Sequence, residues 1–501
     1  MLPACVDPAG PGVQRVRRGH FFLCYNPCSC IQVIIPLEVG VQSLKRALIL
    51  LSFLLLATLT WMSCGSAASP STKTSGVKYR AFITNNVSSG TAVASIDILD
   101  AQNDIRPPVS PISAGNTPGM MVVTPNRAQT LVFSGNGTQF SDNSLSAINN
   151  ASEQNAGHIS LPGMTESFVV SPDSSAAYVA VPTAPVVGQS PGIVEAIALS
   201  SISVTGQVNV PSVHYLSMDN SGNRILGFSD VLSSLAAPCL NQSPSFLFII
   251  TPSNIGVDPC PVIPVPGLDH PVQAFFSSDD STAYIVNCGG ECGGAQASVQ
   301  PLDLSTCQPA PIAACGPPGT AVPVEAASEA LVNGSTMYLA GSYGNPSAPP
   351  QSCPGQSAYT PTCGSLSIVD LSTMAVTASG IAITDGYHNR IALGANGQLF
   401  VGARTCTEAA GVSGCLSIYN TTGAAVGGVP SGGVLIPPAN GDVTGIQPVA
   451  TRQVVYVVQG GELFIYDATT DALYNNPHDP NNPGQIFGLV GNFIDVKTID
   501  F

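Results

Sequence analysis

One pattern recurs eight times along this chain. Eight short apolar runs, each typical of a β-strand, carry an aromatic or aliphatic residue at intervals of 47 to 62 residues: Phe82, Leu131, Tyr178, Ile225, Tyr284, Tyr338, Phe400 and Tyr456. A second apolar residue follows each of them and usually precedes Asp or Asn, as in Ile96-Asp97 and Tyr466-Asp467. Strand-like repetition with a period of ~50 residues is the signature of a radial repeat fold. It predicts one ring-shaped all-β domain, although the length alone would suggest about three domains.

Each unit reads as four strands joined by turns. In the clearest unit, the expected strands cover residues 167–170, 177–181, 194–199 and 203–208. The turn Ser171-Pro172-Asp173-Ser174 separates the first two, because Pro presets φ and Asp accepts hydrogen bonds from the following backbone. The composition agrees with an all-β fold rich in turns, since the chain holds 50 Gly and 43 Pro, and hydrophobic residues make up 44% of it.

Several of these segments resemble a known repeat. Phe82-Ile83-Thr84-Asn85, Ser171-Pro172-Asp173 with Tyr178-Val179, and Ile368-Val369-Asp370-Leu371-Ser372-Thr373 are similar to the YVTN repeat of bacterial β-propellers. The resemblance covers residues 77–501 and implies a single β-propeller of four-stranded blades. Its relatives include surface-layer and envelope propellers and lactonases of the 6-phosphogluconolactonase type, so it implies a fold and leaves the function open.

The two ends of the repeat region predict how the ring closes. The tail NFIDVKTIDF, residues 492–501, reads as one strand with no unit after it, and the segment from Lys78 begins with a second strand that lacks a first. We expect these strands to pair, because closure removes exposed sheet edges. Closure favours eight blades. Seven is the alternative, if the unit near 225–265 is degenerate.

The N-terminal region carries an export signal. Lys45-Arg46 precede the apolar run ALILLSFLLLATLTWM and then Cys64, an order typical of a secretory signal. Cys64 resembles the lipidated cysteine of bacterial lipoproteins, although Trp61 and Met62 depart from the usual lipobox. We therefore expect a signal peptide over 41–63, a Ser/Thr-rich tether over 64–76, and an extension over 1–40 that a translation start assigned too early would explain. The predicted location is the bacterial cell envelope, with the lipid as the only membrane contact, or secretion without an anchor.

The charge balance argues against nucleic acid as a partner. The formal net charge is −15, and five of the 15 basic residues lie at or before Arg46, so the rest of the chain is still more acidic. Phosphate backbones need a basic patch.

Ten cysteines follow Cys64, and they fall into close neighbours. Because an exported chain meets oxidising conditions, we expect five sequential disulfides. The expected pairs are Cys239–Cys260, Cys288–Cys292, Cys307–Cys315, Cys353–Cys363 and Cys406–Cys415. Zinc binding, the alternative, would favour paired CxxC motifs, which this part of the sequence lacks.

The connections between units predict where a site could lie. In an up-and-down meander, the loops that join the second and third strands share one end of the ring with the connections between blades. Those connections carry candidate catalytic residues, namely His214, His388, Arg390 and Glu166, and candidate ligand-binding residues, namely His270, Glu325, Asp385 and Asp442. The alternative interpretation is that each of them caps a strand or bonds a loop carbonyl. No metal or cofactor is expected.

Two functions remain open at this point. The first is a monomeric, non-catalytic envelope propeller that binds a protein, a glycan or a small molecule through its loop-rich face and central funnel. The second is a lactonase-like hydrolase, in which a His or Glu acts as general base on water and Arg steadies an oxyanion. Convergence of the candidate residues within one substrate width would favour the hydrolase.

Overall fold

The computed structural model divides the chain into two units, Met1–Thr72 and Lys73–Phe501. It describes residues 20–26, 29–34, 74–86, 94–135, 143–235, 243–258, 260–307, 314–344, 351–353, 359–360, 362–407, 414–437, 441–477 and 492–500. In the first unit, strands β1 (His20–Asn26) and β2 (Ser29–Ile34) form an antiparallel hairpin. Cys64 and the signal segment lie outside the described residues. No helix among the described residues has the length and hydropathy to cross a membrane.

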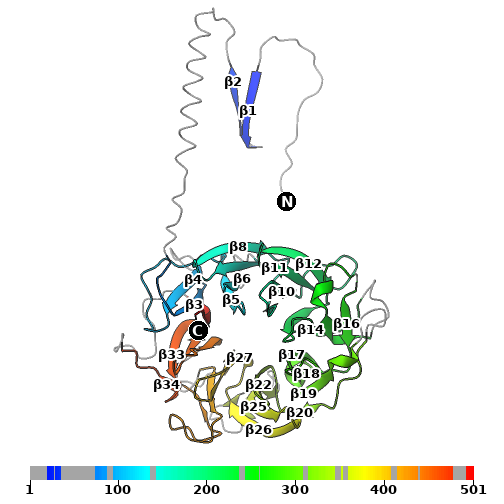
Figure 1. Cartoon of the computed structure of the whole chain (residues 1–501), viewed down its shortest axis with the longest axis vertical. Helices are drawn as coiled ribbons and strands as arrows, with labels where there is room; N and C mark the ends of the chain where they lie inside the picture. The colour runs from blue at the N-terminus through cyan, green and yellow to red at the C-terminus, as the bar shows by residue number, and fades with distance from the viewer. Residues whose placement is uncertain are drawn as a thin grey trace, which may run out of the picture. The chain divides into compact units, whose positions relative to one another are not determined.

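The second unit is an eight-bladed β-propeller (Figure 1). Its blades, each given from the innermost strand outward, have the following bounds. Blade 1 is β35 (Phe493–Thr498), β3 (Arg80–Asn85) and β4 (Ser95–Asp100); blade 2 is β5 (Pro118–Val123), β6 (Gln129–Ser134), β7 (Ser144–Asn149) and β8 (Gln154–Ser160); blade 3 is β9 (Phe168–Val170), β10 (Ala176–Val181), β11 (Ile193–Ala198) and β12 (Ser203–Asn209); blade 4 is β13 (Val213–Met218), β14 (Ile225–Ser233), β15 (Ser245–Ile250) and β16 (Val262–Val265).

The remaining blades continue around the ring in chain order. Blade 5 is β17 (Pro271–Phe276), β18 (Thr282–Asn287), β19 (Ser298–Asp303) and β20 (Val322–Pro323); blade 6 is β21 (Glu329–Asn333), β22 (Thr336–Gly344), β25 (Thr362–Asp370) and β26 (Ala375–Ile383); blade 7 is β27 (Tyr387–Leu393), β28 (Gln398–Arg404), β29 (Leu416–Asn420) and β30 (Val434–Leu435); blade 8 is β31 (Val443–Pro448), β32 (Val454–Gln459), β33 (Glu462–Asp467) and β34 (Ala472–Leu473). Strands β23 (Gln351–Ser352) and β24 (Tyr359–Thr360) pair within the connection between β22 and β25. Short 3₁₀ turns lie at η2 (Pro252–Asn254), η3 (Gly289–Cys292) and η4 (Leu304–Thr306).

The repeat landmarks coincide with the strands that the sequence predicted. All eight residues from Phe82 to Tyr456 lie in the second strand of a blade, and their apolar partners lie in the third. The unit near 225–265 is a complete blade, so the count of eight is confirmed and seven is excluded. Blade 1 has three full strands, and an antiparallel bridge from Ile96 to Ile112 takes the place of the fourth.

The C-terminal strand closes the ring as predicted. Strand β35 pairs antiparallel with β3, with Ala81 opposite Thr498 and Ile83 opposite Val496. The Arg80 guanidinium donates to both carboxylate oxygens of Asp500, at 2.7 and 2.6 Å. A bidentate pair of this kind is the strong form of an ion pair. Blade 1 is therefore built from the two ends of the propeller sequence.

Asp and Ser side chains shape the short turns at the other end of the ring. Asp173 accepts hydrogen bonds from the Ser171 hydroxyl, at 2.6 Å, and from the Ser175 backbone N–H, at 3.0 Å. Asp279 accepts in the same way from the Ser277 hydroxyl, at 2.6 Å. These bonds explain why the turn motif recurs, since Asx-type bonds fix the turn without help from the core.

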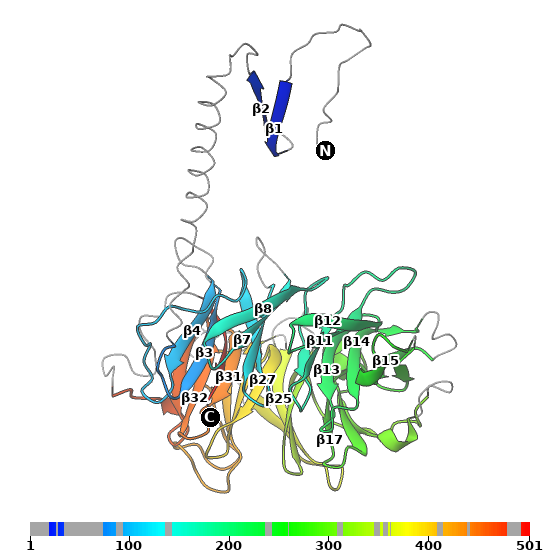
Figure 2. The ribbon, with the colours of Figure 1, turned by 45° about the horizontal axis from the view of Figure 1, so that its top comes forward.

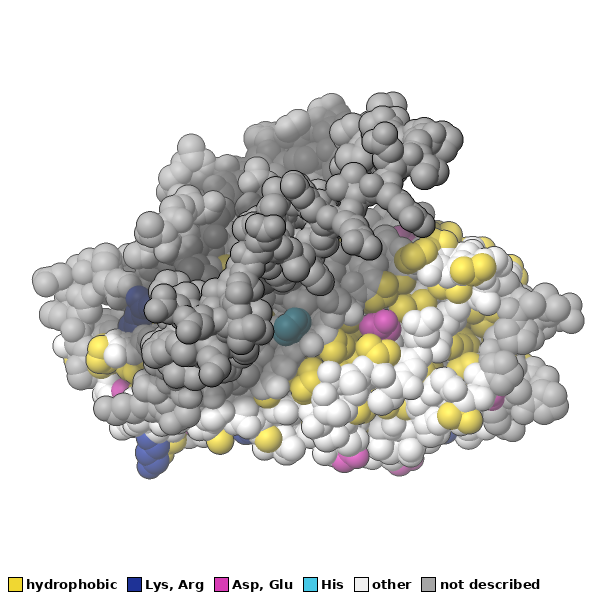
Figure 3. Space-filling model, turned by 90° about the horizontal axis from the view of Figure 1, so that it is seen from above, with side chains coloured by type: hydrophobic (Ala, Val, Ile, Leu, Met, Phe, Trp, Pro, Cys, Tyr) yellow, Lys and Arg dark blue, Asp and Glu magenta, His cyan; other side chains and the backbone are white. Residues whose placement is uncertain are grey.

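The core lies between the blades. Phe82 of blade 1, for instance, packs in one buried cluster with Met121 and Val132 of blade 2. Burying a side chain of this size stabilises the fold by about 1.5–3 kcal/mol. The strands run between the two ends of the ring (Figure 2). On the face seen in Figure 3, the described surface is mostly uncharged, with scattered acidic groups, which agrees with the 9% of charged residues in the sequence.

Four of the five predicted disulfides are present. Cys288–Cys292, Cys353–Cys363 and Cys406–Cys415 close loops between the second and third strands, and Cys307–Cys315 closes the connection after β19. Cys260 is also disulfide-bonded, and Cys239, its predicted partner, lies outside the described residues.

Candidate functional site

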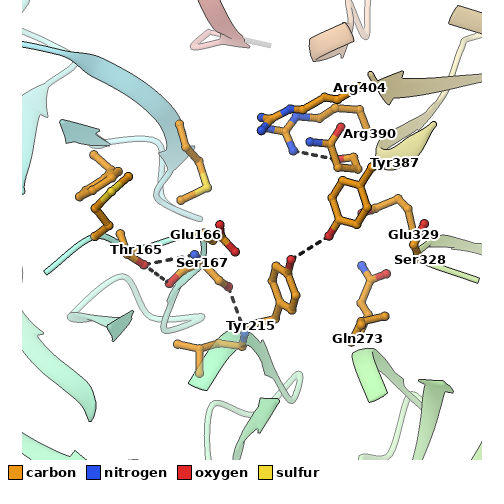
Figure 4. Close-up of a pocket in the computed structure, with 16 residues that line it drawn as sticks. Thr165, Glu166, Ser167, Tyr215, Gln273, Ser328, Glu329, Tyr387, Arg390 and Arg404 are labelled. Carbon is orange, nitrogen blue, oxygen red and sulfur yellow. Dashed lines mark hydrogen bonds between the residues drawn. The ribbon is translucent and has the colours of Figure 1, made fainter. Parts of the chain in front are cut away.

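A cavity of about 280 Å³ occupies the centre of the ring (Figure 4). Its walls come mostly from the inner strands of blades 2, 4, 5, 6 and 7 and from the connections that lead into blades 3 and 6. Phe133 and Arg404 reach it from the second strands of blades 2 and 7. The polar lining residues are Thr165, Glu166, Ser167, Tyr215, Gln273, Ser328, Glu329, Tyr387, Asn389, Arg390 and Arg404. Most of them lie at the end of the ring where the blades connect to one another, which is where the sequence placed the candidate residues.

Repeated bulges aim side chains at this cavity. The pairing of the inner strand slips near its first residues in blades 2, 4, 5, 7 and 8, for example between His388 and Arg390 of β27. A bulge places an extra residue on one strand and breaks the strict alternation of faces. As a result, Tyr387 and Arg390 both line the cavity although three positions separate them. His388, which lies between them, is fully buried and does not line it.

Two arginines of blade 7 lie side by side at the cavity wall. Arg390 donates from Nε to the Thr444 carbonyl, at 2.7 Å, and from Nη1 to the Asn389 carbonyl, at 2.6 Å. The Asn389 side-chain oxygen, turned toward Arg404, accepts from its Nε at 2.8 Å. Among the described residues, no carboxylate oxygen lies within 4.0 Å of either guanidinium. Burial lowers the pKa of Arg404, and the adjacent charge of Arg390 lowers it further.

A glycine allows the backbones of β27 and β28 to approach closely beside Arg404. Gly386, directly before β27, has a φ of 98°, and a Cβ atom there would lie 2.4 Å from the Arg404 carbonyl oxygen. Only glycine allows the two backbones to approach so closely. Tyr387 consequently pairs with Arg404 in the register of β27 and β28, so both side chains reach the same end of the cavity.

Two tyrosines meet across the ring. The Tyr215 hydroxyl, from blade 4, lies 2.7 Å from the Tyr387 hydroxyl, from blade 7. Burial raises the pKa of both phenols, so both are neutral in the physiological range. The two tyrosines separate the central cavity from a second cavity of about 380 Å³, because both side chains line both spaces.

A histidine held by two carboxylates marks the second cavity. His214 Nδ1 lies 3.1 Å from Glu166 Oε2, and its Nε2 lies 3.2 Å from Asp230 Oδ2. The hydrogen bond with Glu166 raises the pKa of His214 and lowers the pKa of Glu166. The trio thus places one imidazole between two acidic side chains, so the acidic groups outnumber the basic one. Glu166 lines both cavities.

Glu329, at the start of β21, has a pKa well above that of an ordinary glutamate. It lines the central cavity, and burial raises its pKa to about 7, against the opposing charge of Arg390. A carboxyl that titrates near neutrality can exchange a proton with a ligand.

The other candidate residues serve the scaffold. His388 donates from Nε2 to the Thr384 carbonyl, at 3.0 Å, and burial lowers its pKa to about 4, so it is neutral. Asp385 accepts from the Thr407 backbone N–H and hydroxyl, at 2.7 and 2.8 Å, and so holds the start of the loop after β28. Asp442 accepts from the Thr405 N–H at 2.7 Å, and Glu325 accepts from the Ser365 hydroxyl at 2.9 Å. None of the four lines either cavity.

His270 reaches the rim of the second cavity. Its Nδ1 lies 3.0 Å from Asp269 Oδ1, and its ring lies 4.3 Å from that of Phe246, between centroids. The structure therefore brings His214, His270, Glu166 and Arg390 to two adjoining cavities, and leaves His388, Glu325, Asp385 and Asp442 outside them. Clusters of three or more His, Cys, Asp or Glu side chains able to hold a metal do not occur among the described residues.

Five ionisable residues of the two cavities were not predicted from the sequence: Tyr215, Asp230, Glu329, Tyr387 and Arg404. Tyr387 adjoins the DGYHNR motif, yet strand alternation favours the neighbouring His388. Arg404 could have been found, because it lies where the second strand of its blade gives way to the next loop, and all second strands end at the same side of the ring. Tyr215 and Glu329 carry no signal of their own in the sequence.

Comparison with known proteins supports the fold. No protein-family model matches this chain, and no curated protein matches it. Among solved structures, the dihydro-heme d1 dehydrogenase NirN in complex with DHE is similar with a TM-score of 0.53 at 11% identity, over 85% of this chain and 75% of that one. A hydrazine synthase from Kuenenia stuttgartiensis is similar with a TM-score of 0.48 at 11% identity, over 73% and 99%. Such distant likeness concerns the β-propeller fold alone, and membership of the YVTN family stays a prediction.

Proposed function

We propose that this protein is a non-catalytic β-propeller of the bacterial cell envelope that binds a small anionic ligand, a carboxylate or a phosphate, at the centre of its ring. One observation carries the binding proposal: Arg390 and Arg404 lie side by side in a cavity without a carboxylate partner among the described residues. Two adjacent half-buried cations repel one another, and an anion between them removes that cost. The planar guanidinium also suits bidentate binding of carboxylate or phosphate.

Substitution of the arginines tests the binding proposal. We expect succinate and inorganic phosphate, titrated by calorimetry, to bind the wild-type propeller, and Arg404→Gln or Arg390→Gln to weaken binding about tenfold or more, the value of a hydrogen bond to a charged group. Arg224→Gln is the matched control, because Arg224 lies at the opposite end of blade 4 and pairs with Asp219 at 3.6 Å. Wild-type protein that binds neither anion, or arginine variants that bind as well as the control, would reject the proposal.

The envelope location rests on a separate set of observations. The signal-like segment before Cys64 and the four disulfides both suit an exported protein. We expect the mature chain to begin at a lipid-modified Cys64, and mass spectrometry of the native N-terminus to show it. A Cys64→Ser variant should be released from the membrane, because the lipid supplies the anchor. An unmodified Cys64 in the envelope protein would exclude lipidation and leave export intact.

A lactonase-like hydrolase is the second candidate, and Glu329 is the observation that favours it. Its raised pKa suits a general base that activates water, and Arg390 in the same cavity could steady the oxyanion formed when water adds to a lactone carbonyl. Acceleration of glucono-δ-lactone hydrolysis that Glu329→Gln abolishes would establish this function. If the protein leaves the spontaneous rate unchanged, that test rejects the hydrolase and favours the binding function.

A further inference from the structure

The central cavity holds separated charges of both signs. Arg404 and Glu166 point into it from opposite walls in Figure 4, and each perturbs the pKa of the other. Yet no ion pair within 4.0 Å joins them. Opposite charges on facing walls attract one another, and the fold keeps them apart because each is anchored locally, Arg404 by Asn389 and Glu166 by His214.

The balance of charge differs between the two cavities, since the arginines line only the central one. The central cavity has the two arginines at one wall, whereas the second cavity has Glu166 and Asp230 around His214. Both cavities share Glu166, Tyr215, Val272 and Tyr387, so a ligand seated on the arginines extends toward the acidic trio. A purely anionic ligand would therefore bring its far end close to a carboxylate, and like charges placed together cost affinity.

We propose that the ligand is an aminocarboxylate, whose carboxylate lies between Arg390 and Arg404 and whose ammonium group lies at Glu166. This inference rests on the proposed binding function and adds the chemical class of the ligand. The ammonium has three donors, and Glu166 Oε1, the Tyr215 and Tyr387 hydroxyls and the Gln273 side chain all lie along the cavity wall as acceptors. A ligand of this class offers an anion to the two arginines and a cation to Glu166.

Four matched probes separate the possibilities. Butyrate carries the anion alone, γ-aminobutyrate adds the ammonium group, glutarate replaces it by a second carboxylate, and butylamine has the ammonium alone. Calorimetric titration of the whole exported protein should show γ-aminobutyrate binding about tenfold tighter, or more, than butyrate and glutarate. Butylamine should bind weakest, because it lacks the group that the arginines hold.

Two charge-neutralising variants assign the recognition to its residues. Glu166→Gln should reduce the preference for γ-aminobutyrate over butyrate to less than about threefold, because it removes the partner of the ammonium group. Butyrate should bind at least as tightly as to wild type, because a negative charge that faces Arg404 is gone. Arg404→Gln should weaken both ligands. Glu325→Gln is the matched control, since Glu325 lies on a connection at the same end of the ring and bonds Ser365 outside both cavities. Thermal melts would verify that each variant folds.

Each contrary result has a distinct meaning. Butyrate or glutarate binding as tightly as γ-aminobutyrate would overturn the aminocarboxylate inference and leave anion binding in place. A preference that survives Glu166→Gln would overturn the assigned position of the ammonium group and, with it, the inference as stated. Absence of binding by all four probes would contradict the proposed function itself.

Discussion

At the scale of single residues, the environment around a side chain decides its role more than its type does. His214 and His388 both begin an inner strand, and the sequence ranked them equally. His214 reaches a cavity between two carboxylates, whereas His388 is buried against the Thr384 carbonyl. Burial disfavours the charged imidazole, and a neighbouring carboxylate favours it, so the two pKa values move in opposite directions.

Glu329 gives a prediction about pH and stability. Its pKa of about 7 lies above the ordinary value of 4.5. Between these values the folded state binds more protons at this site than the unfolded chain, so the free energy of unfolding falls as the pH rises through this window. Glu329→Gln removes this term. Denaturant unfolding from pH 4 to 8 should therefore show the variant gaining stability relative to wild type, by about 1–2 kcal/mol, after allowance for water in the cavity.

Glu291 also has a pKa of about 7, but it is present in both wild type and the Glu329→Gln variant. The difference in unfolding free energy between the two proteins therefore isolates the contribution of Glu329. Parallel profiles for wild type and variant over this range would show that the Glu329 carboxyl titrates normally.

At the scale of elements, three of the four disulfides hold loops at the end of the ring where the site lies. Cys406–Cys415 bridges the loop that follows Arg404 and spans nine positions of sequence. Closing a loop of this size in the unfolded chain stabilises the fold by about 2–3 kcal/mol. The double variant Cys406→Ala/Cys415→Ala should therefore unfold at a lower temperature than wild type.

Peptide mapping without reductant checks the pairing itself. It should recover Cys406 with Cys415 and Cys353 with Cys363 in protein taken from the envelope. Free thiols at these four positions would contradict the sequential pairing. An unchanged melting temperature in the double variant would show that the Cys406–Cys415 bridge does not stabilise the fold.

The strands could be predicted from the sequence, and the site only in part. The alternation of apolar residues and the Asp-containing turns both depend on residues that are close in sequence. Tyr178 could therefore be assigned to a strand, and Asp370 to a turn, from the sequence alone. The cavity depends on which inner strands bulge, and a one-residue slip reverses the face that a side chain takes. Arg390 was found because its motif is unusual. Glu329 was missed because only the closed ring buries its carboxyl.

At the scale of the whole molecule, stability depends on the joining of the two chain ends. Without β35, blade 1 loses its innermost strand and the Arg80–Asp500 pair. Deleting residues 490–501 should therefore lower the melting temperature sharply, far more than trimming a loose tail would. Asp500→Ala, which removes only the ion pair, is the graded control and should cost much less. A truncated protein that melts within about a degree or two of the full chain would contradict ring closure.

The anion site that we propose lies at the adjacent arginines Arg390 and Arg404, in the middle of the ring. Selenate imitates phosphate and carries an anomalous X-ray signal, so crystals of the protein soaked in selenate locate the anion without an assumption about the natural ligand. We expect an anomalous peak between the guanidinium groups of Arg390 and Arg404, and its loss in Arg404→Gln. An ordered cavity with no peak there, or one in which Glu166 or Glu329 already pairs with both arginines, would contradict it.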